Sequence, residues 1–249
     1  MPLEGAIFDL DGVITDTAQV HMKAWKALFD EYLQRRAERD GEPFSPFTEQ
    51  DYLDYVDGMP RYDGVRTFLA SRGLQLPEGT PEDGPDEETV CGLGNRKNAQ
   101  FQQVLEREGA VVFPGSERLV RALRAQGVIT GVASSSKNCK MVLERAGISD
   151  LFGARVDGVV LAEQNLPGKP DPAMFVTCAE WLGVSPARSL VVEDAISGVQ
   201  AGRAGGFGLV IGVNRGADAE ALRENGADWV VEDLSELTVE SINEHFRES

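Results

Sequence analysis

Two aspartates near the start of the chain, in the stretch AIFDLDGVITD, are the first residues whose spacing indicates chemistry. Asp9 and Asp11 lie two positions apart at the end of a predicted buried strand, Gly5–Asp9. If that strand stays extended, both side chains point the same way. A buried carboxylate is costly unless a cation or a hydrogen-bond donor pairs with it. The pair therefore marks either a simple turn or a metal-dependent reaction centre.

Three more polar clusters follow later predicted strands: SSSKN at 134–138, GKPDP at 168–172 and EDAISG at 193–198. Ligands of parallel α/β sheets bind outside the carboxyl ends of the strands, so we expect these clusters to meet Asp9 and Asp11. Each cluster alone is typical of a helix start. GKP is not a P-loop, because Pro170 stands where Ser or Thr is needed. Their order and positions favour one shared site.

The residue types of this shared site indicate phosphoryl transfer. Asp9 and Asp194 offer the hard oxygen ligands that Mg²⁺ prefers. Ser134 and the backbone amides that begin the next helix can form an anion site. Lys169 is a compact cation that can neutralise a phosphate. The sequence therefore predicts a pocket for one phosphoryl group and Mg²⁺.

The elements that must position this site alternate between strand and helix after residue 114. Strands are predicted at Gly5–Asp9, Val128–Ala133, about Arg155–Val160, Leu190–Val192, Gly208–Val213 and Trp229–Val231, with helices at Ser116–Gln126, Lys137–Ala146, Pro172–Leu182, Ala195–Ala204, Ala217–Glu224 and from Ser235. This alternation predicts an α/β fold, a doubly wound, Rossmann-like parallel sheet built from residues 1–16 and 111–249.

The residues between these two parts, 17–110, are predicted to be helical. Helices are expected at 17–36, 49–56, 62–72 and 87–109. The Pro-, Gly- and acid-rich loop LPEGTPEDGPDEE, residues 76–88, is expected to be disordered. We therefore predict a helical cap domain inserted after the first strand.

The net charge limits the kinds of binding partner, and the cysteines indicate the redox state of the thiols. The chain has 41 Asp and Glu against 24 Lys and Arg, a net charge of −17. Such an acidic surface repels nucleic acid and anionic membranes, so neither is expected as a partner. Cys91, Cys139 and Cys178 are far apart, which favours reduced thiols. No signal peptide or membrane span is recognisable, so a soluble, cytoplasmic protein is expected.

The order DxDG, Ser, Lys and ED resembles the haloacid dehalogenase (HAD) superfamily of phosphoryl-transfer enzymes, and the inserted cap resembles its type C1 cap. The stretch FDLDGVITDTAQVHMKAWKAL, with ASSSKN, GKPDPAMF and EDAISGVQAG, further resembles the β-phosphoglucomutase-like group of that superfamily. That group interconverts β-glucose 1-phosphate and glucose 6-phosphate through glucose 1,6-bisphosphate. The resemblance implies a sugar phosphate as substrate and Mg²⁺ as cofactor.

The resemblance also implies a role for each core residue. Asp9 would be the nucleophile that forms an aspartyl-phosphate, and Asp11 the general acid and base. Mg²⁺ would be held by Asp9, the backbone carbonyl of Asp11 and Asp194, with Glu193 in support. The phosphate would be bound by Ser134, Ser135, Asn138 and Lys169, and Lys169 with the metal would keep Asp9 ionised.

In the cap, the resemblance assigns Arg61 and Lys97 to the distal phosphate of the substrate, and Thr17 and His21 to the hinge. Asp57 stands where the group is expected to have Lys. Lys23, Lys26, Arg66 and Arg96 are the basic residues that could compensate for it.

Two cap segments, around Arg39–Asp54 and Gly79–Glu88, look longer than in the compact mutases. A HAD-type sugar-phosphate phosphatase therefore remains an alternative, and a non-catalytic phosphosugar-binding protein is a second. A monomer is expected, because similar proteins with a mobile cap usually are monomers.

Overall fold

The computed structural model describes residues 2–215 and 219–248 of the 249. The chain divides into two compact units: Met1–Asp16 with Ala110–Ser249, here called the core, and Thr17–Gly109, here called the cap. The sequence placed the second boundary one residue later, after residue 110. Within the described ranges, no helix is both long and apolar enough to cross a membrane.

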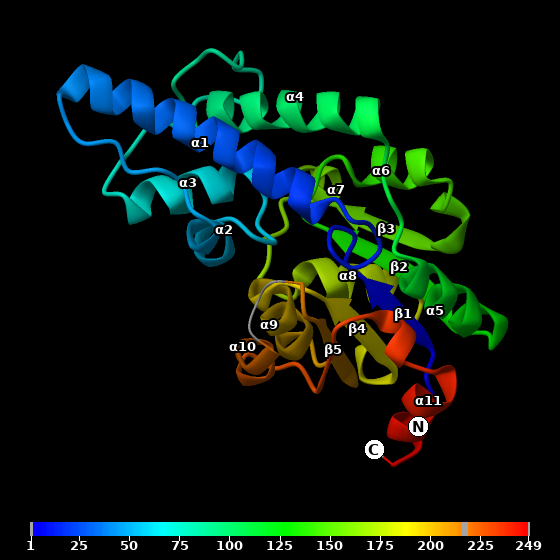
Figure 1. The fold of residues 1–249 in the computed structure, drawn as a ribbon. Helices are drawn as coiled ribbons and strands as arrows, with labels where there is room; N and C mark the ends of the chain where they lie inside the picture. Colours follow the sequence, from blue (N-terminus) through cyan, green and yellow to red (C-terminus); the bar gives the residue numbers. More distant parts are fainter. Residues whose placement is uncertain (1, 216–218, 249) are drawn as a thin grey trace. The chain divides into compact units, whose positions relative to one another are not determined.

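The core is built on a six-stranded parallel sheet with the order β3-β2-β1-β4-β5-β6 (Figure 1). The strands are β1 Gly5–Phe8, β2 Ile129–Ser134, β3 Ala154–Asp157, β4 Ser189–Glu193, β5 Leu209–Val213 and β6 Trp229–Val231. In the middle of the sheet, Phe8 at the end of β1 pairs with Val132 of β2 and Val192 of β4. Residues that follow these three strands therefore gather at one edge. The predicted doubly wound α/β fold is confirmed.

Helices cover both faces of the sheet (Figure 1). They are α5 Pro114–Ala125, α6 Cys139–Ala146, α7 Gly158–Gln164, α8 Ala173–Leu182, α9 Ile196–Ala204, α10 Ala219–Glu224 and α11 Val239–Glu248, with short 3₁₀ turns η1 Ser149–Leu151, η2 Pro186–Arg188 and η3 Leu234–Glu236. Helices α8 and α9 pack together on the face that carries Ile7 and Val191, where Phe175 and Cys178 are fully buried. Burial on both faces explains why the strands are almost wholly apolar.

Two predicted boundaries in the core are wrong by three or more residues, while others, such as the start of α6 at Cys139, differ by one or two. The strand expected near Arg155–Val160 ends at Asp157, whose carboxylate accepts the N–H groups of Val159 and Val160 at 3.0 and 3.1 Å. This N-cap starts α7, although β-branched residues favour a strand. The last helix begins at Val239 and not at Ser235, because Ser235 lies in η3. The first two residues of the helix predicted at Ala217–Glu224 lie outside the described residues.

The cap consists of four helices: α1 Ala18–Asp40, α2 Glu49–Tyr55, α3 Arg61–Ser71 and α4 Val90–Glu108. Helices α1 and α4 run side by side (Figure 1). Aromatic rings fill the space between the helices, with Phe29 of α1 centred 4.1 Å from Phe68 of α3. Helix α1 continues four residues beyond the predicted end at Arg36, to a left-handed Gly41 with φ 69°.

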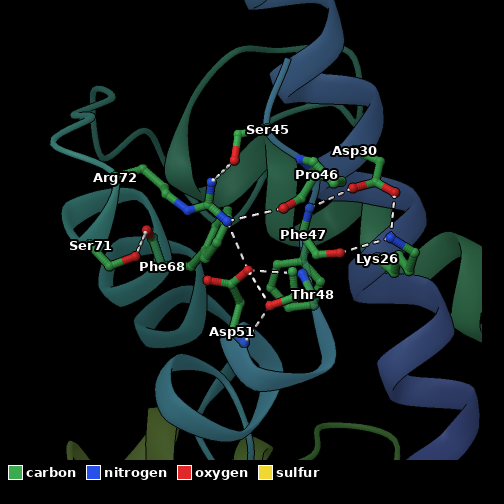
Figure 2. A network of polar contacts seen from close by, with 10 residues as sticks. All are labelled: Lys26, Asp30, Ser45, Pro46, Phe47, Thr48, Asp51, Phe68, Ser71 and Arg72. Atoms are coloured by element: carbon green, nitrogen blue, oxygen red, sulfur yellow. Dashed lines mark hydrogen bonds and ion pairs between the residues drawn. The ribbon is translucent and has the colours of Figure 1, made fainter. Parts of the chain in front are cut away.

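The long segment between α1 and α2 is fixed to the cap by a polar network (Figure 2). Arg72, the C-cap residue of α3, donates to Pro46 O at 3.1 Å and to Asp51 Oδ2 at 2.8 Å. Lys26 of α1 donates to Phe47 O at 2.7 Å, and the ring of Phe47 is buried. These contacts make the segment an integral part of the cap.

The acidic loop, residues 76–88, was predicted to be disordered, and the structure contradicts this. The side-chain amide of Asn95 in α4 donates to Pro81 O at 3.0 Å and to Asp83 O at 2.9 Å. The loop also lies directly on Gly92, where a Cβ would come within 2.3 Å of Glu87 O. Gly92 thus provides room for the loop, and Asn95 holds it by hydrogen bonds. A prediction from composition could not include either contact.

None of the three cysteines forms a disulfide and all three are buried, which yields a direct prediction. Burial raises the pKa of Cys178 to about 12 and the pKa of Cys139 well above its usual value. Because the thiolate is the reactive form, we expect no thiol of the native protein to react rapidly with Ellman's reagent at about pH 8. In denaturant all three should react. A rapid native reaction of one thiol would contradict this packing.

Candidate active site

The first aspartate follows the central strand, and the second lies in a turn. The backbone N–H of Asp9 still donates to Val192 O at 2.9 Å. The chain then turns: Leu10 O accepts the N–H groups four and five residues later, at 2.9 and 2.8 Å, and Gly12 has φ 88°. The strand therefore does not stay extended through Asp11, and the expected direction of its side chain does not follow from strand alternation.

Lys169 joins Asp9 to the end of β4. Its Nζ donates to Asp9 Oδ1 at 2.5 Å and also to Glu193 Oε1. The lysine side chain is completely buried, and the two carboxylates are almost so. Three segments that are distant in the sequence thus meet at the edge where the sequence placed them.

The charge balance of this cluster is negative. Burial raises the pKa of Asp9; Lys169 lowers it, while Glu193 and Asp11 raise it again, and the net result lies well above the usual value. Burial lowers the pKa of Lys169, but Asp9 and Glu193 raise it by more than burial lowers it. The pKa therefore lies above its usual value, and the lysine remains a cation. Lys169 alone therefore does not offset the burial of Asp9, and the expectation that Lys169 together with a metal keeps Asp9 ionised stays a prediction.

Glu193 supports its neighbours. Its Oε2 accepts the backbone N–H groups of Asp194 at 2.9 Å and Ala195 at 2.8 Å, while Oε1 receives Lys169. A Cβ on Gly198 would come within 1.9 Å of Oε1, so only glycine fits there. Both carboxylate oxygens thus hold the start of α9 and the lysine.

The SSSKN loop after β2 reaches the second aspartate. Ser134 Oγ donates to Asp11 Oδ2 at 3.4 Å and accepts the backbone N–H of Ser136 at 3.1 Å. A Cβ on Gly158 would approach Ser135 O to 2.5 Å, so the loop packs closely on the start of α7. Asn138, which is buried, is the N-cap residue of α6. The loop thereby brings a hydroxyl group and a helix start beside Asp11.

The fourth predicted segment contributes Asp194, next to the turn that carries Asp11. A Cβ on Gly12 would lie 1.8 Å from Asp194 Oδ2, so the carboxylate rests on the glycine backbone. Among the described residues, no three side chains of His, Cys, Asp or Glu are grouped to hold a metal. Mg²⁺ needs fewer, since it takes one or two carboxylates and keeps waters. Two carboxylates, Asp9 and Glu193, share the single cation Lys169, which leaves room for a divalent cation, and Asp9, Asp194 and the Asp11 carbonyl are suitable donors.

In the cap, Arg61 lies between α3 and α4. Its Nη2 donates to Asn98 Oδ1 at 2.7 Å, and Asn95 Oδ1 accepts the hydroxyl of Tyr62 at 3.0 Å. A Cβ on Gly94 would come within 3.0 Å of Arg61 Cγ, so this glycine allows the two helices to approach. Burial lowers the pKa of Arg61, and no carboxylate in the described part of the chain forms an ion pair with it.

Lys97 and His21 are also in direct contact. Lys97 Nζ pairs with His21 Nδ1 and lies 4.8 Å from the ring centroid of Trp25. The imidazole of His21 stacks on Phe101 with the centroids 4.0 Å apart, and its backbone N–H donates to Thr17 O at 2.9 Å. The structure therefore brings Thr17, His21 and Lys97 together at the start of α1.

Comparison with known proteins places this geometry in a family. The haloacid dehalogenase-like hydrolase family matches residues 3–206, which is most of the chain. The chain belongs to this family. It is an enzyme family, and the HAD-like core with its inserted helices agrees with the matching structures.

Individual HAD relatives are β-phosphoglucomutases by name. The β-phosphoglucomutase of Mycobacterium tuberculosis (strain CDC 1551 / Oshkosh) is 52% identical over 239 residues, which cover 94% of this chain and 91% of that protein. The β-phosphoglucomutase of Bacillus subtilis (strain 168) is 34% identical over 247 residues, or 99% and 96% of the two chains. A crystal structure of β-phosphoglucomutase from Clostridium difficile superposes with a TM-score of 0.77 at 28% identity, covering 99% and 98%.

The sequence interpretation missed several residues of this HAD enzyme. Asn95 and Asn98 belong to CGLGNRKN, a segment that lacks the third glycine of a nucleotide-binding motif but contains these contacts to Tyr62 and Arg61. Arg215 donates to Gly12 O at 3.0 Å. No spacing rule identifies such residues. Asn95 and Asn98 accept hydrogen bonds through their side-chain amide oxygens, and Arg215 donates to a backbone oxygen.

The basic residues considered as replacements near Asp57 are mostly engaged elsewhere. The structure pairs Lys26 with Asp30, Arg66 with Asp63 and Glu78, and Arg96 with Glu31. Lys23 is exposed. The ion pairs give Lys26, Arg66 and Arg96 other partners in the cap.

Proposed function

We propose that this HAD enzyme is a Mg²⁺-dependent β-phosphoglucomutase, which converts β-glucose 1-phosphate to glucose 6-phosphate through glucose 1,6-bisphosphate. The observation that carries the proposal is the buried Asp9 at the centre of the sheet edge, bonded to Lys169 and followed by Asp11 in a turn. The names of its relatives support the sugar phosphate as substrate. We further propose that the enzyme is a cytoplasmic monomer.

In the proposed reaction, Asp9 attacks phosphorus and forms an aspartyl-phosphate while the bond to the sugar oxygen breaks. Asp11 donates a proton to that leaving oxygen. It later takes the proton of the sugar hydroxyl that attacks the aspartyl-phosphate, so that the phosphoryl group moves to the sugar oxygen and the Asp9 carboxylate is released. The contact of Ser134 with Asp11 Oδ2 supports this role by orienting the carboxyl. Lys169 offsets the negative charge of the phosphoryl oxygens and of Asp9. Two like residues can take opposite parts because their surroundings differ.

The residues proposed to hold Mg²⁺ are Asp9, Asp194 and the carbonyl of Asp11, with Glu193 holding Lys169 and the start of α9. The metal, when bound, supplies positive charge at the transferring phosphoryl group. Ser134, Ser135, Asn138 and Lys169 are proposed to bind that group. Phosphoryl transfer depends mainly on positioning and charge neutralisation, and these residues are of the types that supply both.

A bisphosphate needs a second set of phosphate-binding residues, and we propose Arg61 and Lys97 for this role, with Thr17 and His21 at the hinge. The guanidinium of Arg61 contacts the uncharged amide oxygens of Asn95 and Asn98, which leaves its positive charge for an anion. The alternative is a sugar-phosphate phosphatase, which the hydrolase description of the family supports.

The deciding experiment follows two products in one tube. Purified protein is incubated with Mg²⁺, β-glucose 1-phosphate and a trace of glucose 1,6-bisphosphate, while glucose 6-phosphate and free phosphate are measured. Glucose 6-phosphate without matching phosphate release supports the mutase. Stoichiometric phosphate with little glucose 6-phosphate identifies a phosphatase. Absence of both products, with no labelling of Asp9 by acetyl phosphate, would support the non-catalytic alternative.

Replacing Arg61 by alanine should affect the two kinds of substrate unequally. We expect kcat/KM for the mutase reaction to fall by about 10- to 100-fold, since a charge-assisted contact of about 1.5–3 kcal/mol is lost. Hydrolysis of acetyl phosphate, which has no distal phosphate, should change by less than about two-fold.

Arg66→Ala is the matched control for Arg61→Ala. Arg66 lies on the same helix but is half-exposed and paired with Asp63 and Glu78. It should leave both activities near wild type. Equal losses on both substrates in Arg61→Ala would argue against the distal-phosphate role.

A further inference from the structure

Arg215, which belongs to none of the family motifs, contacts the turn that carries Asp11. It lies two residues beyond the end of β5, and its Nε donates to Gly12 O at 3.0 Å across 203 positions of the chain. Its guanidinium is held from other sides as well. Nη1 donates to Glu232 O at 3.2 Å, Nη2 lies 3.8 Å from Asp233 Oδ2, and the group lies over the ring of Phe113, 3.9 Å from the centroid. The side chain is therefore fixed before it reaches the turn.

Gly12 is the residue of the turn that most needs an external contact. Glycine restricts its own φ and ψ less than any other residue, so the chain alone does not select one orientation of its carbonyl group. No other residue fits, because φ is 88° and a Cβ would collide with Asp194. The orientation of this one residue thus sets both the direction of Asp11 before it and the room for the Asp194 carboxylate.

The other carbonyl groups of the turn are held differently. Leu10 O accepts N–H groups from within the turn, and Ile14 O accepts the N–H of Phe113 at 3.0 Å. Val13 O accepts the hydroxyl of Ser116 at 2.5 Å. Arg215, in contrast, brings a charged donor to the Gly12 carbonyl. A charge-assisted hydrogen bond is about twice as strong as a neutral one, so it can determine the orientation of the glycine.

We propose that Arg215 is a positioning residue for the reaction: by holding the Gly12 carbonyl it fixes the turn in which Asp11 serves as general acid and base. The proposal rests on the role of Asp11 in the proposed function, but it holds equally for a mutase and a phosphatase. The contacts of the Arg215 guanidinium are with Gly12 O, Glu232 O, Asp233 and the Phe113 ring. Its effect therefore passes through the backbone of the turn.

The test replaces Arg215 by methionine, which keeps an unbranched apolar side chain over Phe113 and removes every donor. We expect kcat to fall by about 10- to 100-fold, as is usual when a residue that orients a reacting group is lost. KM should stay within about two-fold, because substrate-binding residues are untouched. The same factor is expected for mutase turnover and for acetyl phosphate hydrolysis. Arg215→Lys, which keeps the charge but loses the planar stack, should recover part of kcat.

Arg203→Met is the matched control. Arg203 also donates to a glycine carbonyl, Gly226 O, at 2.8 and 3.1 Å, and it also pairs with an aspartate, Asp228. It lies in the core but does not contact the turn. This variant should retain wild-type kcat whatever its melting temperature. An equal fall in kcat in both variants would overturn the proposal. So would a rise in KM with unchanged kcat in Arg215→Met.

A second measurement does not depend on activity. Hydrogen exchange of a peptide that covers residues 9–17 reports the N–H groups of Gly12, Ile14 and Thr15, all bonded within the turn. Exchange should be faster in Arg215→Met than in wild type and in Arg203→Met. Unchanged exchange would overturn the proposal even if the wild type were inactive. An inactive wild type with faster exchange in the variant would instead refute the proposed function alone. If Arg215→Met does not fold, Arg215→Lys is compared in the same way.

Discussion

Asp9→Asn is expected to lower kcat by at least about 10⁴-fold while the protein stays folded. Without the carboxylate nucleophile no aspartyl-phosphate can form, and loss of a covalent nucleophile has effects of this size or larger. The near-isosteric amide keeps the packing around Lys169, which still pairs with Glu193. Mass spectrometry after treatment with acetyl phosphate and Mg²⁺ should show a phosphorylated wild type and an unmodified variant.

The same variant should be at least as stable as the wild type when no metal is present. The pKa of Asp9 is raised mainly by burial, so the folded state disfavours its charged form above the ordinary pKa of an aspartate. Asparagine removes that charge, and the melting temperature in EDTA near neutral pH should be equal or higher. The difference should shrink as the pH falls and the wild-type Asp9 takes up its proton. Asp150→Asn, an exposed control, should keep full activity; normal turnover of Asp9→Asn would refute the nucleophile assignment.

Lys169→Met is expected to have the largest effect on stability. The lysine is completely buried between two nearly buried carboxylates, and its loss leaves Asp9 and Glu193 without a cation in the absence of metal. Removal of one partner from a buried ion pair costs about 3–5 kcal/mol. For a chain of this size that corresponds to a melting temperature lower by roughly 6–20 °C. Activity should fall by at least about 10³-fold, because the transferring phosphoryl group loses its protein cation.

Thermal unfolding in EDTA checks this prediction, with Lys140→Met as the control. Lys140 is exposed on α6 and lies 3.8 Å from Glu144, so its replacement should shift the melting temperature by no more than about 2 °C. The double variant Asp9→Asn/Lys169→Met should regain part of the lost stability, because one of the two stranded charges is gone. A Lys169→Met protein as stable as the control would contradict the ion-pair account.

The central part of the candidate site could be predicted because it follows from topology. Asp9 and Asp194 directly follow β1 and β4, and Ser134 is the last residue of the adjacent β2. The carboxyl ends of adjacent parallel strands meet at one side of the sheet in any right-handed βαβ arrangement. Lys169 required the resemblance as well, since a lysine in a loop has no fixed direction. The charge state of Asp9 could not be predicted, because it depends on how far burial outweighs one lysine.

The errors in the fold have local physical causes. Val159 and Val160 favour a strand by propensity, but the carboxylate of Asp157 satisfies their N–H groups and starts a helix. The acidic loop has the composition of a disordered segment, yet two hydrogen bonds from Asn95 hold it on α4. Arg215 could not be recognised because its partner is a backbone oxygen far away in sequence. Single tertiary contacts of this kind leave no periodic signal.

The central position of β1 has a consequence for how the protein is made. Strand β1 needs partners on both sides, Ile129–Ser134 and Ser189–Glu193, and both are synthesised more than 100 residues after it. The cap, in contrast, is one uninterrupted stretch, Thr17–Gly109, and has its own aromatic core. During synthesis the cap can therefore complete its own contacts before the strands that pair with β1 have been made. The segment GAIF is thus exposed to chaperones and to misassociation until both neighbouring strands have been made.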